Sequence, residues 1–363
     1  MRSAIDQLRN TGARSLMILA CEDDRWPVEK LGRLLQSLDV PVFGGIFPSI
    51  IHRSQLHRNG TILVGFPVSL EVAVVSRLRD QAGIDPQVRR LSSTLADCRS
   101  LFAFVDGLSV NLETFVESLF GVVGVRASVI GGGAGHLDLI QRPCLLGNQG
   151  VLVDSALLVA LPMCVDRGIA HGWELLSGPF LVTRSHGNVL EELNYRPAFE
   201  VYRSEVEADS SMRFAETDFF SISKTYPLGI GSVDGEFLVR DPIKQSEAAL
   251  ICVGDVPENA TIHLLKGDAS ALIAAAGGAA EAALAMRRSR LKEDHLTPRM
   301  AMIFDCISRR LFLDDRFAEE LGAIDAALPD LDCVVGVLSI GEIASSRRGM
   351  IELMNKSILI GLN

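Results

Sequence analysis

Paired cysteines, a basic excess and aromatic residues are scarce in this sequence of 363 residues, and each shortage excludes a class of protein. The seven cysteines are widely spaced and form no CxxC pair, which excludes a zinc knuckle and a thioredoxin-type redox site. A formal net charge of −10 argues against nucleic acids and anionic membranes as partners, because both bind cationic surfaces. Aromatic residues make up 6% of the chain, too few for a surface on which bases stack.

Targeting and catalytic motifs are missing as well. The first residues, MRSAIDQLRNTG, carry charge where a signal peptide needs an apolar segment. The longest weakly polar stretch, 269–285, is interrupted by Glu281 and is too short to span a bilayer. Neither GxSxG nor HExxH occurs, and no cysteine lies in an electropositive setting. We therefore expect a cytoplasmic protein that is not an enzyme, with no catalytic residues and no metal site.

What the sequence does contain is one pattern used three times. Each copy reads as a buried strand, an amphipathic helix, a glycine-containing strand, a polar excursion and a final strand. The copies begin at SLMILAC (15–21), SLFAFVDG (100–107) and RMAMIFDC (299–306). The chain length favours two domains. We predict an α/β (mixed α+β) fold, in which repeated strand–helix–strand–strand modules form mixed sheets flanked by helices.

A region of different texture separates the second and third copies. Short alternating strands with turn signals fill 201–253, and the Asp-Gly pair inside Ser232–Val239 predicts a hairpin. We place the domain boundary near Leu193. The division predicts an N-terminal domain over 1–193 and a C-terminal domain over 194–363.

The glycines of SVIGGGAGH (128–136) raise the question of a phosphate loop. Gly131 and Gly133 match the first two positions of a dinucleotide fingerprint, but His136 stands where the third glycine is needed. The residues that follow contain a proline and no helical periodicity, so no helix N-terminus is available for a phosphate. Two explanations stay open for these glycines, Gly132 included: they let two backbones approach closely, or they form the floor of a ligand pocket.

Several segments, taken in order, resemble those of the FIST family, in which a FIST N-terminal domain is followed by a FIST C-terminal domain. They are IGGGAG (130–135), LLGNQGVLVDSALLVAL, AHGWELLSGPFLVTRSHGNVLEELNYRPAFEVY (170–202), YPLGI (226–230), GEFLVRDPI (235–243), VGDVPENATIHLLKGD, and GEI followed by Asn355. The resemblance covers nearly the whole chain, and the order and spacing of the segments are more specific than any one of them.

The resemblance implies an intracellular sensory module that binds a small molecule, with amino acids as the proposed ligands. Members of the family are often encoded with or fused to signalling proteins such as histidine kinases or cyclic-dinucleotide enzymes. The two FIST parts take up the length of this chain, so we expect it to signal through a separate partner. One branch resembles nitric-oxide-sensing haemoproteins. We expect no cofactor; the alternative is haem b, with His171 as its axial ligand.

Residues from both halves form the predicted ligand-binding set: Gly131, Gly132, Gly133, His171, Trp173, Tyr226, Arg240, Glu342 and Asn355. His171, beside Trp173, can hydrogen-bond a ligand carboxylate, or it is a satisfied buried histidine. Arg240 can clamp a carboxylate, or pair with the adjacent Asp241. Glu342 can accept a hydrogen bond from a ligand amine, or cap a nearby turn.

The preferred hypothesis is a sensor whose ligand lies between two domains, because closure there changes contacts on both sides. Two other classes stay open. A buried nucleophile and base in one cleft would indicate an enzyme, whereas the lack of a cavity at the glycine strand ends would indicate a scaffold.

Overall fold

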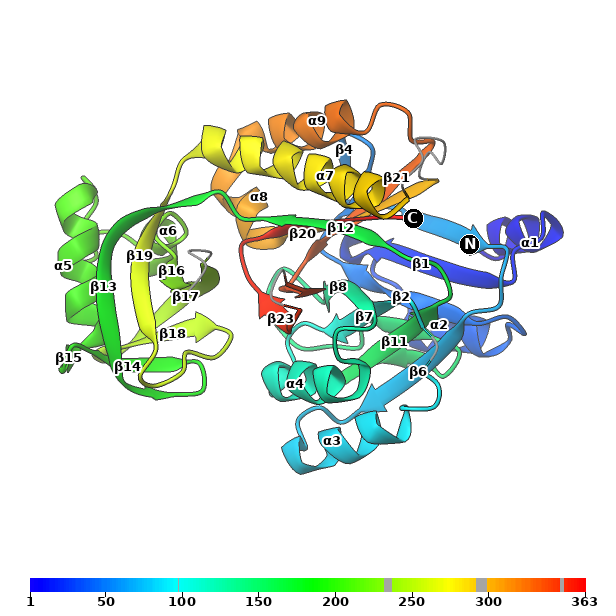
Figure 1. The fold of residues 1–363 in the computed structure, drawn as a ribbon, viewed down its shortest axis with the longest axis horizontal. Helices are drawn as coiled ribbons and strands as arrows, with labels where there is room; N and C mark the ends of the chain where they lie inside the picture. Colours follow the sequence, from blue (N-terminus) through cyan, green and yellow to red (C-terminus); the bar gives the residue numbers. More distant parts are fainter. Residues whose placement is uncertain (97, 232–236, 292–298, 347–348) are drawn as a thin grey trace.

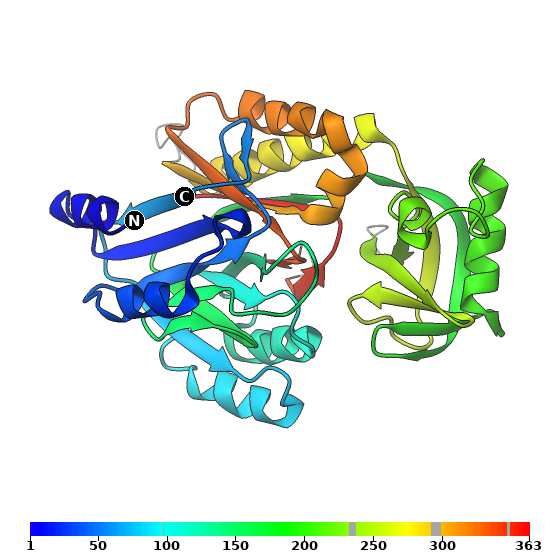
Figure 2. The same ribbon diagram turned by 180° about the vertical axis from the view of Figure 1, so that it is seen from behind.

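The computed structural model describes residues 1–363 except 97, 232–236, 292–298 and 347–348. A large unit of three sheets is joined to a small unit by two long strands, β13 (Trp173–His186) and β19 (Thr261–Gly267), as Figure 1 shows. Both chain termini lie on the large unit, away from the small one (Figure 2). The mixed α+β class and the two-unit arrangement predicted from the sequence are confirmed.

The large unit consists of the three predicted modules. In each module the first strand runs parallel to the second and antiparallel to the last. The first module has α1 (Arg2–Asn10), β1 (Ser15–Cys21), α2 (Val28–Gln36), β2 (Val42–Phe47) and β5 (Thr61–Phe66). The second has α3 (Gln81–Arg90), β7 (Ser100–Asp106), α4 (Leu112–Val123), β8 (Ser128–Ala134) and β11 (Ser155–Leu161). The third has α7 (Ala269–Leu291), β20 (Met300–Cys306), α8 (Ile307–Leu313), α9 (Phe317–Ala327), β21 (Cys333–Ser339) and β24 (Ile358–Leu362).

The polar excursions form hairpins that are exchanged between modules. The hairpin β3–β4 (Ile50–His52, Gln55–His57) of the first module pairs with β21 of the third. The hairpin β9–β10 (Leu145–Gly147, Gly150–Leu152) of the second pairs with β2 of the first. The hairpin β22–β23 (Glu342–Ser345, Ile351–Met354) of the third pairs with β8 of the second. The exchange is cyclic: each sheet is completed by a hairpin from one other module, and the three sheets together need all three modules.

Two further strands extend the sheets at their edges, and helices cover the sheet faces. β6 (Glu71–Ser76) pairs with β11, and β12 (Asp166–Ala170) pairs with β24. Helix α7 packs along β12 and β24 (Figure 1). Within the described residues, α7 is the one helix long and apolar enough to cross a membrane, which by itself is weak evidence for a span.

The three sheets meet in one apolar core. Phe43 of β2 lies 6.0 Å from Phe104 of β7, measured between ring centres, and Phe104 lies 5.7 Å from Phe304 of β20. All three side chains are fully buried. Each module contributes one of these rings, so this contact fixes the modules around a common centre.

The small unit is a closed antiparallel barrel inserted between β12 and α7, and so between the second and third modules. Its strands follow the order β13-β19-β16-β17-β18-β14-β15, and β13 also pairs with β14, which closes the sheet. The remaining elements are β14 (Val189–Leu193), β15 (Arg196–Pro197), α5 (Ala198–Asp209), α6 (Phe219–Ser223), β16 (Leu228–Ile230), β17 (Leu238–Ser246) and β18 (Ala249–Val253). The predicted hairpin turn at 232–236 lies outside the described residues, although the flanking β16 and β17 do pair.

The predicted boundary between residues 193 and 194 falls between β14 and β15 of this barrel. In space, the chain passes from the large unit to the barrel at Trp173 and returns at Gly267, two residues that pair with each other. As a division into sequence domains, the boundary stays a prediction.

Candidate functional site

A cavity of about 410 Å³ lies between the barrel and the large unit. The barrel side contributes Phe220, Asp241, Ile243, Lys244 and Val253, and the large unit contributes Leu137, Leu139, Cys306, Ile307, Ser308, Leu311, Ile340, Gly341 and Asn355. The lining is mostly apolar, and the size is typical of a small-molecule pocket. Residues that follow β20 and β21 form much of the large unit's wall, at the carboxyl ends of a parallel strand pair, where ligands commonly bind.

Asp241 is the buried polar group on the barrel side. Its carboxylate accepts a hydrogen bond from Ser308 Oγ at 2.8 Å and lies 3.1 Å from Nζ of Lys356. Burial raises the pKa of Asp241, while the Lys356 charge and the Ser308 hydroxyl act in the opposite direction. Ser308 and Lys356 belong to the large unit, so Asp241 links the barrel to it.

Lys356 is fully buried, and three partners of its ammonium group offset the loss of water. Besides Asp241, Nζ donates to the carbonyl oxygen of Lys224 at 2.9 Å and lies 4.8 Å from the centre of the Trp173 ring. The Trp173 indole donates in turn to the carbonyl oxygen of Lys356 at 2.9 Å. Trp173, a predicted site residue, therefore positions this lysine and does not line the cavity.

Asn355 is the predicted site residue that lines the cavity directly. Its side chain is buried, and its Oδ1 atom has no hydrogen-bond partner among the described residues. A buried acceptor without a donor costs about 1–3 kcal/mol. A donor group on a bound molecule would satisfy it.

Glu342 is fully buried and does not line the cavity. Its Oε1 atom lies 2.7 Å from Ser339 Oγ, which is also 3.2 Å from the carbonyl oxygen of Asp305. A hydroxyl has one proton, so when Ser339 donates to the Asp305 carbonyl, a protonated Glu342 can donate to Ser339. Burial raises the pKa of Glu342 to about 8, while hydrogen bonds to its charged form from Ser339 and the backbone of Ser357 act in the opposite direction.

The raised pKa makes stability depend on pH. We expect the free energy of unfolding to fall as pH rises from about 4.5 to about 8, because the folded protein keeps a proton that the unfolded chain releases. The slope from this one group is at most about 1.4 kcal/mol per pH unit. Urea denaturation across this range should show a flatter profile for Glu342→Gln and an unchanged one for Glu281→Gln, an exposed control on α7. An equally steep profile for Glu342→Gln would contradict the assignment.

Arg240 and Tyr226 are occupied by the protein itself. Arg240 donates to the carbonyl oxygens of Asp255 at 2.8 Å and Leu353 at 3.1 Å. Tyr226 donates from its hydroxyl to Asp209 at 2.7 Å, within the barrel. Neither residue lines the cavity, so the structure does not bring them together with Asn355.

His171 lies at another cavity, between α7, β12 and the β22–β23 hairpin. Its Nδ1 atom accepts the backbone N–H of Trp173 at 3.0 Å, and burial lowers its pKa to about 4. The neutral ring therefore carries its proton on Nε2. An axial haem ligand needs a free electron pair on the nitrogen that binds iron, so His171 does not fit this role as it is arranged.

The glycines of β8 face protein atoms and line none of the cavities described here. A Cβ at Gly131 would lie 1.9 Å from the carbonyl oxygen of Ala103, and one at Gly133 would lie 2.1 Å from that of Ile340. A Cβ at Gly132 would lie 2.9 Å from the Phe304 ring. The observed geometry thus corresponds to the first of the two explanations, close approach of neighbouring chain segments.

Sequence reasoning missed three polar residues of the site: Asp241, Ser308 and Lys356. From the sequence, Asp241 was considered only as an ion-pair partner of Arg240. The side chains of adjacent strand residues point to opposite faces of the sheet, so the two do not pair. Lys356 follows Asn355 directly, but a lysine next to a strand gives no signal of burial. Their association depends on the insertion of the barrel, which joins segments far apart in the sequence.

The arrangement can bind a molecule but does not resemble a catalytic centre. Cys306 lines the cavity, and burial raises the pKa of its thiol, so it is not a thiolate. No group of three or more metal-binding side chains occurs in the part of the chain that the structure describes.

The fold and the cavity define a two-unit α/β protein with a mostly apolar cavity between its units. The FIST N domain matches residues 15–196, and the FIST C domain matches residues 198–345. The chain belongs to the FIST family, and the predicted family and domain order are confirmed. FIST domains are small-ligand sensor domains of signal transduction, a sensory and not an enzymatic family. No curated protein matches the chain.

Proposed function

We propose that the cavity between the barrel and the large unit binds a small apolar amino acid. The protein would act in the cytoplasm and report occupancy to a separate signalling protein, such as a histidine kinase or a cyclic-dinucleotide enzyme. The observation that carries the proposal is the unpartnered Oδ1 atom of Asn355 in the wall of a mostly apolar cavity. The hydrogen bond that Nδ1 of His171 accepts from the Trp173 backbone does not favour the haem alternative.

Each part of an amino acid has a counterpart in this cavity. The amine would donate to Asn355 Oδ1, and the carboxylate would face Lys244, whose exposed side chain lies at the rim. An aliphatic side chain would pack against Leu139, Ile243 and Leu311. Lys244 thus takes the role that the sequence assigned to Arg240.

A ligand in this position would touch both units. It can change their relative placement only if it binds one placement more tightly than another. The Asp241 link to Ser308 and Lys356 borders the cavity, so movement of the barrel would change that link as well. A partner that binds one placement would then sense occupancy.

Calorimetry of the full chain with leucine, isoleucine, valine and phenylalanine tests the proposal. Leucinol, which lacks the carboxylate, and 4-methylpentanoate, which lacks the amine, separate the two head-group contacts. We expect saturable binding of at least one amino acid and about tenfold weaker binding of the corresponding compound without the amine. No heat from any amino acid, with the protein shown to be folded, would refute the proposal.

Asn355→Leu separates binding from stability. The change removes an unsatisfied buried acceptor, so thermal stability should be equal or higher, while affinity falls about tenfold or more. Asn10→Leu, at the exposed end of α1, is the matched control and should leave affinity unchanged. Unchanged affinity in Asn355→Leu would contradict the assigned contact.

A further inference from the structure

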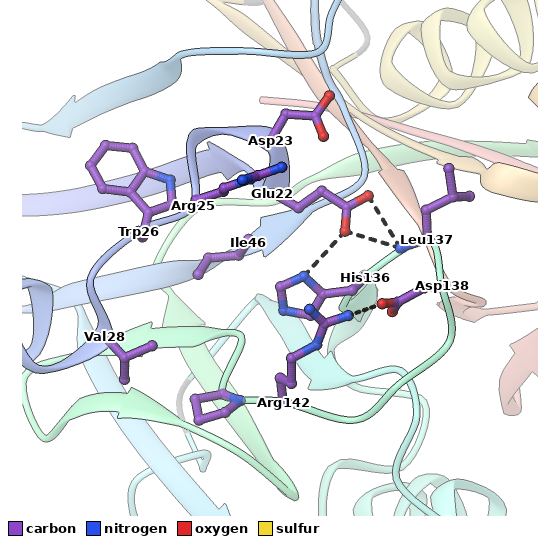
Figure 3. Close-up of a pocket in the computed structure, with 11 residues that line it drawn as sticks. Glu22, Asp23, Arg25, Trp26, Val28, Ile46, His136, Leu137, Asp138 and Arg142 are labelled. Carbon is purple, nitrogen blue, oxygen red and sulfur yellow. Dashed lines mark hydrogen bonds and ion pairs between the residues drawn. The ribbon is translucent and has the colours of Figure 1, made fainter.

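A third cavity, of about 680 Å³, lies at the carboxyl ends of β1 and β2 (Figure 3). Its lining comes from the turn after β1, from β2 and from the segment after β8: Glu22, Asp23, Arg25, Trp26, Val28, Ile46, His136, Leu137, Asp138, Arg142 and Pro143. The cavity between the barrel and the large unit (the interdomain cavity) lies at the ends of β20 and β21 in the third module. β1 and β2 are the corresponding strands of the first module, so the cavity at their ends is in the equivalent position. Leu137 lines both cavities, which are therefore neighbours.

A histidine with a free ring nitrogen lies in this cavity. Nδ1 of His136 is 3.1 Å from Oε2 of Glu22, and a carboxylate only accepts, so Nδ1 carries a proton. Glu22 also accepts the backbone N–H of Leu137 at 3.1 Å, which fixes the carboxylate (Figure 3). The Nε2 atom of His136 is buried and has no partner among the described residues. It is positioned to hydrogen-bond a bound molecule.

Charges of both signs line the cavity: the carboxylates of Glu22, Asp23 and Asp138, and the guanidinium groups of Arg25 and Arg142. Asp138 pairs with Arg142, Glu22 lies against His136, and Asp23 lies 3.6 Å from Arg58, which is outside the lining. The guanidinium group of Arg25 has no ion-pair partner in the described part of the chain, and Figure 3 shows no contact drawn from it.

Unpaired backbone N–H groups lie at the start of α2, three residues after Arg25 in the chain. The helix begins at Val28, in the cavity wall, and no side chain caps its N-terminus. Arg25 and these backbone N–H groups favour an anion.

The apolar part of the lining favours a ligand with an aromatic ring. Trp26 is half-buried, and its indole N–H donates to the carbonyl oxygen of Cys21 at 3.1 Å, which holds the ring in place. Ile46 and Pro143 add apolar surface. A fixed indole beside aliphatic groups is a surface on which a planar ring packs.

We infer that this cavity is a second ligand site, which binds a small aromatic carboxylate. The carboxylate contacts Arg25 and the start of α2, the ring packs against Trp26, and His136 Nε2 hydrogen-bonds a polar group of the ligand. The inference does not depend on the function proposed for the interdomain cavity, because Leu137 is the one residue that the two linings share.

Titration of the full chain with benzoate, 4-hydroxybenzoate and phenylacetate tests the inference. Binding is measured by calorimetry and by tryptophan fluorescence. The chain has two tryptophans, and Trp173 is buried, so a change in fluorescence reports mainly on Trp26. We expect saturable binding of at least one of these acids, with benzamide, the neutral analogue of benzoate, and benzylamine binding about tenfold more weakly. In Trp26→Phe the fluorescence change should disappear while calorimetric binding remains.

Two arginine variants provide the matched comparison. Arg25→Met should weaken benzoate binding about tenfold, whereas Arg33→Met, an exposed arginine on α2, should change it less than about twofold. Asn355→Leu should leave benzoate binding unchanged, which separates this site from the interdomain cavity. Absence of saturable binding by all three acids, equal binding of benzamide, or unchanged affinity in Arg25→Met would overturn the inference. The benzamide comparison uses the unmodified chain, so it decides the matter even if a variant fails to fold.

Discussion

Replacing Gly131 with alanine is expected to lower the free energy of unfolding by about 3 kcal/mol, because the new methyl group has no space. Its Cβ would lie 1.9 Å from the carbonyl oxygen of Ala103, the residue with which Gly131 pairs across β7 and β8. A backbone oxygen cannot move aside as a flexible side chain can, so the two strands would have to separate. Urea denaturation followed by circular dichroism measures the loss.

The same close approach occurs in the other two modules. Gly44 pairs with Ile18, and a Cβ there would lie 1.9 Å from the Ile18 carbonyl oxygen. At Gly336, which pairs with Ile303, the corresponding distance is 2.7 Å. The recurrence at one register position shows that this glycine belongs to the repeated fold.

Gly121 provides the control for this prediction. It lies within α4, where an added Cβ meets no atom within 4 Å. Gly121→Ala should raise the free energy of unfolding by about 0.5–1 kcal/mol, because alanine loses less backbone entropy in a helix. Similar effects of the two substitutions would contradict the packing explanation.

Replacing Lys356 with methionine should cost about 3–5 kcal/mol of stability, because it leaves the buried carboxylate of Asp241 without its cation. Asp241 can take up a proton to avoid this charge, and burial already raises its pKa. The penalty should therefore be smaller at low pH and grow as pH rises. Thermal and urea unfolding across pH measure it, with the exposed Lys30→Met on α2 as control.

A second substitution distinguishes the lost ion pair from a general packing defect. Combining Lys356→Met with Asp241→Leu removes both charges, so much of the lost stability should return. If the double variant is no more stable than Lys356→Met alone, the charge of Asp241 is not the cause.

Local sequence patterns were sufficient for the elements of the three modules. SLMILAC and SLFAFVDG predict β1 and β7, which span Ser15–Cys21 and Ser100–Asp106 in the structure. Buried apolar runs and helical periodicity are local signals, and here tertiary contacts do not override them. The exclusion of a phosphate loop is local in the same way, because His136 replaces the third glycine of the fingerprint and no helical pattern follows it.

The candidate site was predictable only in part. Asn355 lines the cavity, whereas Arg240 and Tyr226 hydrogen-bond to other protein groups and Glu342 is buried outside the lining. Side-chain type indicates which hydrogen bonds a residue can make, but not which partner the fold places within hydrogen-bond distance. In the close-packed interior, the Arg240 guanidinium group hydrogen-bonds to the backbone carbonyl oxygens of Asp255 and Leu353 and is not free for a ligand.

The sequence by itself determined the repeat, the fold class and the family, since each is recorded in residues close together along the chain. Tertiary structure alone decided the exchange of hairpins, the insertion of the barrel and the cavity between barrel and large unit. These depend on pairings such as Asp241 with Lys356 and β22 with β8, across more than a hundred residues. Such contacts form only when the modules pack together, because the burial that stabilises them comes from all three at once.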